Sequence, residues 1–120
     1  MGRATPDRIR QQLAEDIFGV TMTPPEARAA LILHRMAPGR IVPQLRVAKH
    51  RVDLAIPASR VAIEVDGHPA HYTDEGIRRD REIDDRLEIA GWAVVRLRNN
   101  QTEEEWRELI YQALGGRCAR

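Results

Sequence analysis

The chain has 120 residues, 42% hydrophobic and 31% charged, with a formal net charge of +1, which fits one compact globular domain and excludes a disordered or membrane-embedded chain. No apolar run approaches the roughly 20 residues that span a bilayer, and the polar first residues contain no secretory signal, so we expect a cytoplasmic protein with no membrane partner. Cys118 is the only cysteine, which excludes an internal disulfide and a cysteine-based zinc site.

Two helices are predicted at the start of the chain. The first spans about 6–18, with Thr5 as its N-cap and a proline at its first position. The second spans about 24–36, and a capping box begins at its N-cap Thr23. Glu26 is the third helical residue after Thr23. It either bonds back to the amide of the cap or reaches a site elsewhere in the fold.

Three short strands are predicted next. Residues 41–45 form the first. The second spans about 50–57 and alternates, with Val52, Leu54 and Ile56 facing one way and Arg51, Asp53 and Ala55 the other. The third spans 61–66, with Val61, Ile63 and Val65 opposed to Ala62, Glu64 and Asp66. The short polar turn at Ala58-Ser59 predicts that the last two strands form a β-hairpin.

The remaining elements are a long polar helix at about 74–90, a strand at 92–97 and a final helix. Gly91 ends the long helix, and a second capping box at residues 102–105 opens the last one. The order of elements predicts an α/β fold (an α+β mixed sheet) of about four strands flanked by helices.

The predicted hairpin indicates a cation site. If the hairpin closes around Ala58-Ser59, Asp53 lies directly opposite Glu64 on one face of the sheet. Like charges in that position destabilise a strand pair, but a divalent cation between them reverses the effect, because Mg²⁺ prefers carboxylate oxygens. The alternative is an exposed edge hairpin with two solvated carboxylates. The same register predicts a cross-strand ion pair between Arg51 and Asp66.

Two further groups carry chemistry. Asp80 lies within the apolar stripe of the long helix and Asp84 at its edge, so each carboxylate needs an arginine, a histidine or the cation site as its partner. His68 and His71 follow the third strand directly and can transfer protons near neutral pH, or remain ordinary surface residues. A zinc site on these two histidines is a weaker alternative.

These residues resemble a known family. The segments at 51–57 and 61–67, followed by His71, Asp80 and residues 91–96, are similar to the very-short-patch-repair (Vsr)-like endonuclease domains of the PD-(D/E)XK nuclease superfamily. The resemblance runs from about residue 23 to residue 99. It divides the chain into an N-terminal helical extension, residues 1–22, and a Vsr-like endonuclease domain, residues 23–120.

The resemblance implies a restriction-endonuclease-like core and a catalytic set of Glu26, Asp53, Glu64, His71 and Asp80. Asp53, Glu64 and the backbone carbonyl of Val65 are the implied Mg²⁺ ligands, and Mn²⁺ is expected to substitute. Asp66 stands where the superfamily has a lysine, and Lys49 cannot replace that lysine by its spacing. The role of Asp66 and His68 is therefore left open, and Ile83 stands where a basic residue is expected.

The function implied is hydrolysis of phosphodiester bonds in DNA by a monomer or homodimer. Residues 1–51 carry a charge of +5 and residues 52–120 a charge of −4, so a basic half can follow the phosphate backbone, although ordinary surface charge gives the same count. The candidate DNA contacts are Gln44, Arg46, Arg51, Arg78, Arg79 and Arg96. The alternatives are a nucleic-acid-binding module that has lost catalysis and a protein-interaction domain of the same fold.

Overall fold

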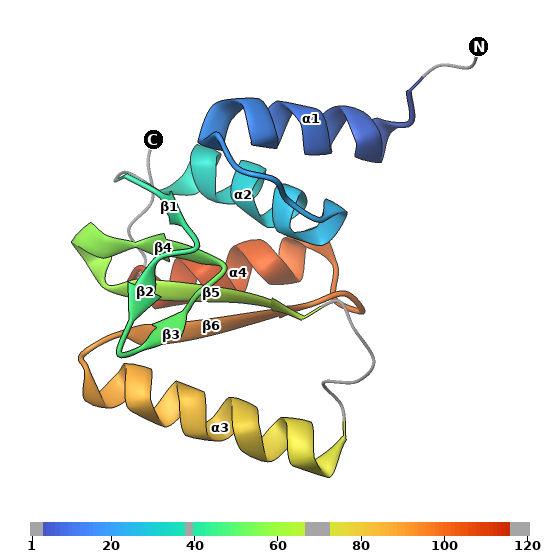
Figure 1. The fold of residues 1–120 in the computed structure, drawn as a ribbon. Helices are drawn as coiled ribbons and strands as arrows, with labels where there is room; N and C mark the ends of the chain where they lie inside the picture. Colours follow the sequence, from blue (N-terminus) through green and yellow to red (C-terminus); the bar gives the residue numbers. More distant parts are fainter. Residues whose placement is uncertain (1–3, 38–39, 67–72, 116–120) are drawn as a thin grey trace.

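A mixed four-stranded sheet lies at the centre of the molecule, with helices on both of its faces (Figure 1). The computed structural model describes residues 4–37, 40–66 and 73–115. The strand order is β1-β4-β5-β6, where the strands are β1 (Val42–Pro43), β4 (Leu54–Ile56), β5 (Val61–Asp66) and β6 (Ala93–Arg98). β5 and β6 are parallel and the other neighbours antiparallel, which confirms the predicted mixed sheet.

The four helices match their predicted positions, and the predicted caps Thr5, Thr23 and Thr102 form. The helices are α1 (Pro6–Phe18), α2 (Pro24–Met36), α3 (Asp74–Ile89) and α4 (Glu103–Ala113). Both predicted capping boxes form, at the N-termini of α2 and α4. A capping residue stabilises a helix end by about 1 kcal/mol because it satisfies otherwise unpaired amides. In the described ranges, none of these helices has the length and apolar character needed to cross a bilayer.

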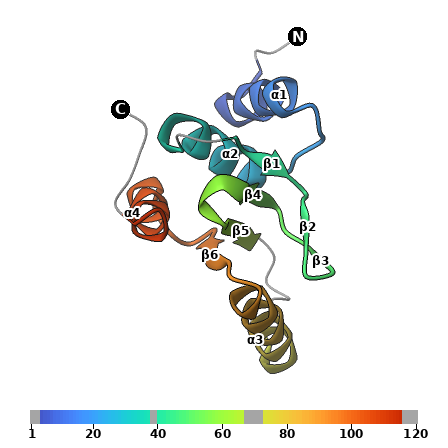
Figure 2. The same cartoon turned by 90° about the vertical axis from the view of Figure 1, so that its left-hand side faces the viewer.

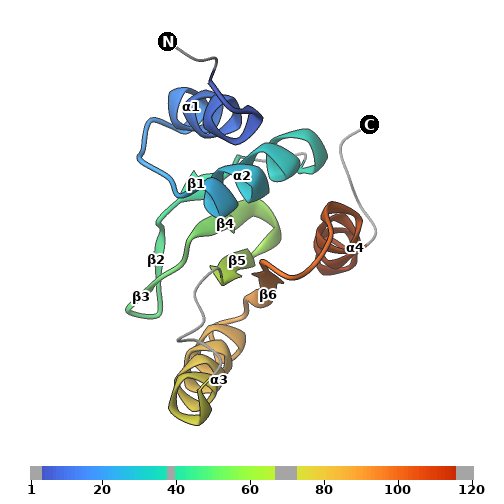
Figure 3. The ribbon, with the colours of Figure 1, turned by 90° about the vertical axis from the view of Figure 1, so that its right-hand side faces the viewer.

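Two apolar clusters lie on opposite faces of the sheet. The larger one joins α1, α2 and α4 to strand residues such as Leu54, Ile63 and Leu97. The smaller one contains Leu87 of α3, together with Val47, Val52, Ala55 and Ala62. Figures 2 and 3 show α3 on the side of the sheet away from α2 and α4. Glu64 and Asp66 alternate with Ile63 and Val65, so they face the α3 side.

The hairpin register is the predicted one. Leu54 pairs with Ile63, Ala55 with Ala62 and Ile56 with Val61. The chain reverses through a single 3₁₀ turn, Pro57–Ser59, and Arg60 completes the reversal in the left-handed region at φ 52°. Asp53 directly precedes β4, so this register brings its side chain beside β5 near Glu64.

The prediction of one continuous strand at 50–57 was wrong. The chain bends at Val52 and Asp53, so that β3 (His50–Arg51) pairs with β2 (Arg46–Val47) in a separate two-stranded sheet. As a consequence Val52 lies in the α3-side cluster and not with Leu54 and Ile56. The predicted strand at 41–45 is likewise shortened to β1, because Gln44 turns the chain with φ 54°.

Candidate active site

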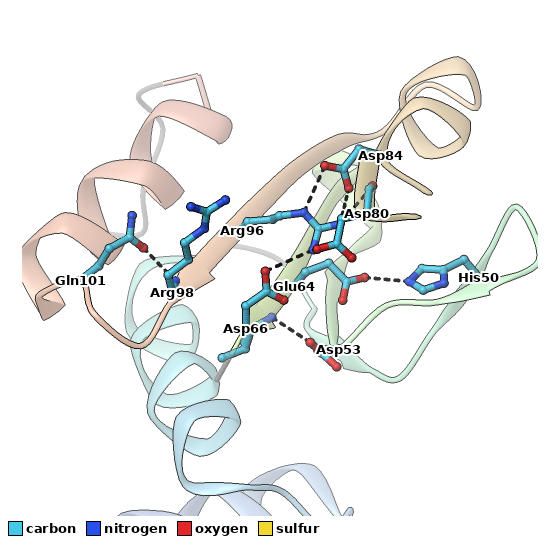
Figure 4. A network of polar contacts seen from close by, with 10 residues as sticks. His50, Asp53, Glu64, Asp66, Asp80, Asp84, Arg96, Arg98 and Gln101 are labelled. Carbon is cyan, nitrogen blue, oxygen red and sulfur yellow. Dashed lines mark hydrogen bonds and ion pairs between the residues drawn. The ribbon is translucent and has the colours of Figure 1, made fainter. Parts of the chain in front are cut away.

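Asp53 lies close to Glu64, which faces the α3 side of the sheet (Figure 4). The backbone N–H of Val65 donates a hydrogen bond of 2.8 Å to Oδ2 of Asp53. The two side chains lie close enough that each changes the pKa of the other, and Glu64 is only 8% exposed. Burial and the repulsion between two negative charges favour one proton held by this pair in the absence of a cation.

The surroundings of the pair favour that proton. Burial, followed by the charge of Asp53, raises the pKa of Glu64 to about 9. Burial is also the largest cause of the raised pKa of Asp53, and the negative charge of Glu26 adds to it. The hydrogen bond from Val65 opposes this by favouring the ionised form of Asp53. Asp53 is therefore the better candidate for the carboxylate and Glu64 for the acid.

His50 completes the contacts of Glu64 and was not predicted. Its Nε2 lies 3.1 Å from Oε1 of Glu64. Burial, followed by the charge of Arg96, lowers the pKa of His50, so the ring is neutral near pH 7. The tautomer protonated at Nε2 can then donate to Glu64. Strand alternation had placed His50 with the core residue Leu54, and the bend at residues 52–53 turns it to the site instead.

Arg96 of β6 lies at the centre of a second group of carboxylates (Figure 4). Its Nη2 lies 2.6 Å from Oδ1 of Asp84, and its Nε donates to the other oxygen of that carboxylate at 3.1 Å. Its Nη1 lies 3.4 Å from Asp66 and 3.6 Å from Asp80. Burial lowers the pKa of Arg96, but Asp84, Asp66 and Asp80 outweigh it, and the pKa is raised.

The Arg96 network bears on two predictions: the ion pair of Asp66 and the DNA contact of Arg96. Asp66 is paired with Arg96 and not with Arg51, which donates instead to Oε1 of Gln44 at 3.3 Å. The predicted Arg51–Asp66 pair was wrong because β3 leaves the main sheet. The Arg96 side chain is 15% exposed and surrounded by carboxylates, so its guanidinium faces these aspartates and not a solvent-exposed surface of the kind that a phosphate contact needs.

An open cleft of about 330 Å³ connects the two groups. His50 and Glu64 line one part of it, and Asp66, Asp80 and Arg96 another. Arg79 of α3 also lines the cleft. A further hollow of about 240 Å³ lies beyond Arg96, between α3 and β6.

The other predicted residues are placed as follows. Glu26 completes the capping box of α2, since its Oε1 accepts from the N–H of Thr23 at 2.9 Å, yet it lies close enough to Asp53 to raise the pKa of that residue. Both interpretations of Glu26 are thus compatible with its position. The remaining candidate DNA contacts are exposed, namely Gln44, Arg46, Arg51 and Arg78. His68 and His71 lie outside the described residues.

The donor set of the Asp53–Glu64 pair fits a magnesium ion. Within residues 4–37, 40–66 and 73–115, no three His, Cys, Asp or Glu side chains are arranged to hold a metal. Mg²⁺ does not need such a cage, because it keeps several waters and is commonly bound by one or two carboxylates. Zinc, which takes three or four protein ligands, fits the described residues less well.

The model of a restriction endonuclease-like family, REase_MTES_1575, matches residues 30–112. The chain belongs to this family. The match covers all the strands, α3 and nearly all of α4, and it includes Asp53, Glu64 and Arg96. The REase_MTES_1575 assignment and the mixed sheet flanked by helices agree on a restriction-endonuclease-like nuclease domain. No curated protein and no solved structure gives a significant match.

The shared proton gives a testable pH dependence. Because the folded-state pKa of Glu64 is raised from 4.5 to about 9, the stability that its protonated form contributes is complete below pH 4.5 and is lost as the pH rises toward 9. We therefore expect Glu64→Gln to raise the Tm of the metal-free protein at pH 8 by about 4 °C or more, the shift that roughly 1 kcal/mol causes in a small domain. Thermal melts between pH 4 and 9 in a chelator measure this.

Glu82→Gln, which changes an exposed glutamate on α3, is the matched control and should leave the melting curves unchanged. Adding Mg²⁺ should stabilise the wild type at pH 8 and have little effect on Glu64→Gln, because a cation binds only the deprotonated pair. Equal slopes of Tm against pH in wild type and Glu64→Gln would contradict the shared proton.

Proposed function

We propose that this domain is a metal-dependent endonuclease that hydrolyses phosphodiester bonds in DNA, with the Vsr-like arrangement of acidic residues. The observation that carries the proposal is the closeness of Asp53 to Glu64, whose side chain lines an open cleft of a restriction-endonuclease-like fold. Burial and the charge of Asp53 favour a proton on Glu64, and a divalent cation such as Mg²⁺ or Mn²⁺ would replace that proton.

In this proposal Asp53 and Glu64 hold the cation, with the backbone carbonyl of Val65 as a further ligand. A bound Mg²⁺ supplies charge stabilisation for the phosphate and lowers the pKa of an attacking water. The Val65 amide fixes the carboxylate of Asp53, and His50 holds Glu64 through its Nε2. Both contacts restrict the orientation of the ligands, which is the usual role of groups hydrogen-bonded to metal ligands.

The remaining residues have supporting roles. Arg96 orders Asp66 and Asp80 at the edge of the cleft and favours ionisation of Glu64 by its charge. Arg79 lines the cleft and is suited to a phosphate contact. Glu26 adds negative charge near Asp53. The resemblance to Vsr-like domains implies that His71 orients or deprotonates the attacking water.

The test is cleavage of supercoiled plasmid. The purified protein should convert plasmid to nicked or linear DNA with Mg²⁺ or Mn²⁺ present, and a chelator should stop the reaction. Calorimetric titration with Mg²⁺ should show one site and the release of about one proton at pH 7, because the shared proton must leave. Absence of both cleavage and metal binding would refute the proposal.

A second candidate is a nucleic-acid-binding module that has lost catalysis. It is favoured by Asp66, which stands where the superfamily has a lysine and is ion-paired with Arg96. This candidate predicts DNA binding that weakens as salt rises, with no cleavage in Mg²⁺ or Mn²⁺. A protein-interaction domain would instead show no salt-dependent binding to DNA.

A further inference from the structure

The short hairpin formed by β2 and β3 stands apart from the main sheet, beside α3 (Figures 2 and 3). The side chains of its two residue pairs point to opposite faces of the hairpin. Val47 and His50 pair with each other and face the core and the site, where Val47 is buried and His50 contacts Glu64. Arg46 and Arg51 form the other pair, and both are exposed. The outward face of the hairpin therefore carries two adjacent cations.

The pairing of two arginines opposes folding. The N–H of Val52 donates to the carbonyl of Leu45 at 2.9 Å, so the Arg46–Arg51 pair next to it is of the non-hydrogen-bonded kind. In such a pair the side chains start closest together, with Cβ atoms about 4.5–5.5 Å apart, and like charges there are destabilising. Gln44 accepts a hydrogen bond from Arg51 but carries no charge that would offset the repulsion.

The tip of the hairpin adds a third cation at a further cost. Ala48 and Lys49 both adopt left-handed backbone conformations, with φ 50° and φ 67°. Such a turn favours asparagine and glycine, and for other residues the conformation costs about 1–2 kcal/mol each. Strain of this kind is concentrated at functional sites. Lys49 is the only lysine of the chain, and it is exposed at this tip.

The inward-facing residues of the hairpin hold it close to the site. His50 lies between Lys49 and Arg51 in the sequence and contacts Glu64 at 3.1 Å. A polyanion bound in the cleft, which His50 lines, would lie near these cations. Its phosphates would offset the repulsion between Arg46 and Arg51, which nothing described in the protein does.

We propose that the β2–β3 hairpin is a phosphate-binding arm that holds the nucleic-acid backbone beside the cleft through Arg46, Lys49 and Arg51 acting together. The proposal rests on the proposed function for the identity of the ligand, and it adds Lys49 and a shared role to the two arginines predicted singly. The arm contacts phosphates and not base edges, so its contribution is independent of sequence.

The test is the salt dependence of binding to a 20-base-pair DNA duplex, measured by fluorescence anisotropy in a chelator so that no cleavage occurs. For wild type, log K falls with log salt by about 0.9 per phosphate contact. The triple variant Arg46→Gln, Lys49→Gln, Arg51→Gln should reduce the slope by about 3 and weaken binding about tenfold or more. Lys49→Gln alone should reduce the slope by about 1.

The control is Arg8→Gln, Arg10→Gln, Arg107→Gln, which removes three exposed arginines from α1 and α4, two helices that lie away from the β2–β3 hairpin (Figure 2). It should leave the slope within about 1 of wild type. The proposal of a phosphate-binding arm would be overturned if both triple variants reduced the salt slope equally. It would also be overturned if the hairpin variants left the slope unchanged. If the arm proposal is wrong, the wild type still cleaves plasmid. If the proposed function is wrong, the wild type does not cleave plasmid. The hairpin triple variant should melt no lower than wild type, because it relieves the repulsion.

Discussion

Replacing Asp53 with asparagine is expected to reduce DNA cleavage by about 10²–10³-fold without unfolding the protein. The loss follows because a metal supplies several kcal/mol of transition-state stabilisation and about 1.4 kcal/mol corresponds to a factor of ten in rate. Asparagine keeps an oxygen that can accept the hydrogen bond from the Val65 amide, so the fold around β4 and β5 is retained. What it removes is the negative charge, on which a cation depends.

The measurement is the rate of plasmid nicking in Mg²⁺, with circular dichroism to confirm folding. Asp16→Asn is the matched control, since Asp16 is exposed on α1 and far from the cleft. DNA affinity in a chelator should be unchanged or slightly higher in Asp53→Asn, because a carboxylate near the phosphate is lost. Cleavage by Asp53→Asn at the wild-type rate would exclude Asp53 as the principal ligand.

The fold was largely predictable because its boundaries depend on local chemistry. Threonine caps precede all four helices, and Thr23 and Thr102 form complete capping boxes. The hairpin register was also predictable, since the turn at residues 57–60 and the alternation of apolar residues allow one pairing. The contact between Asp53 and Glu64 follows from that register.

The errors arose where tertiary packing overrides alternation. Residues 50–57 alternate without interruption in the sequence, and nothing local marks the bend at Val52 and Asp53. The bend buries Val52 against the α3 side and frees His50 to contact Glu64. The signal available for His50 was its place in the chain, three residues before a candidate metal ligand, but alternation pointed its side chain the wrong way.

The sequence predicted that Asp80 and Asp84 need a partner, but it did not identify Arg96 as that partner. The helix wheel placed Asp80 and Asp84 on or beside the buried stripe of α3, which required a partner of opposite charge. The partner itself lies in β6, and only the crossover from β5 through α3 brings these segments together. Sequence alone left an arginine, a histidine and the metal site as open choices. It could not predict that one guanidinium serves three carboxylates.

Replacing Arg96 with methionine is expected to destabilise the protein by about 3–5 kcal/mol, the usual cost of removing one partner from a buried ionic group. Methionine matches the length of the stem but removes the cation that Asp66 and Asp84 face. Asp66 is 6% exposed, so water replaces the lost partner poorly there. Urea unfolding at pH 7 without metal or DNA measures the loss, and the accompanying fall in Tm should be about 10 °C or more.

Two further variants separate this network from simple loss of side-chain volume. Arg96→Lys keeps the charge but cannot bond both oxygens of Asp84, so it should lose an intermediate amount. Asp84→Asn should destabilise the wild type yet recover part of the stability of Arg96→Met, because one of the uncompensated charges is then absent. If Arg96→Met lost less than about 1 kcal/mol, or if Asp84→Asn were equally harmful in both backgrounds, the carboxylates would not depend on Arg96. A large loss measured in the absence of DNA would place the main role of Arg96 inside the fold, where it holds α3 against the edge of the cleft.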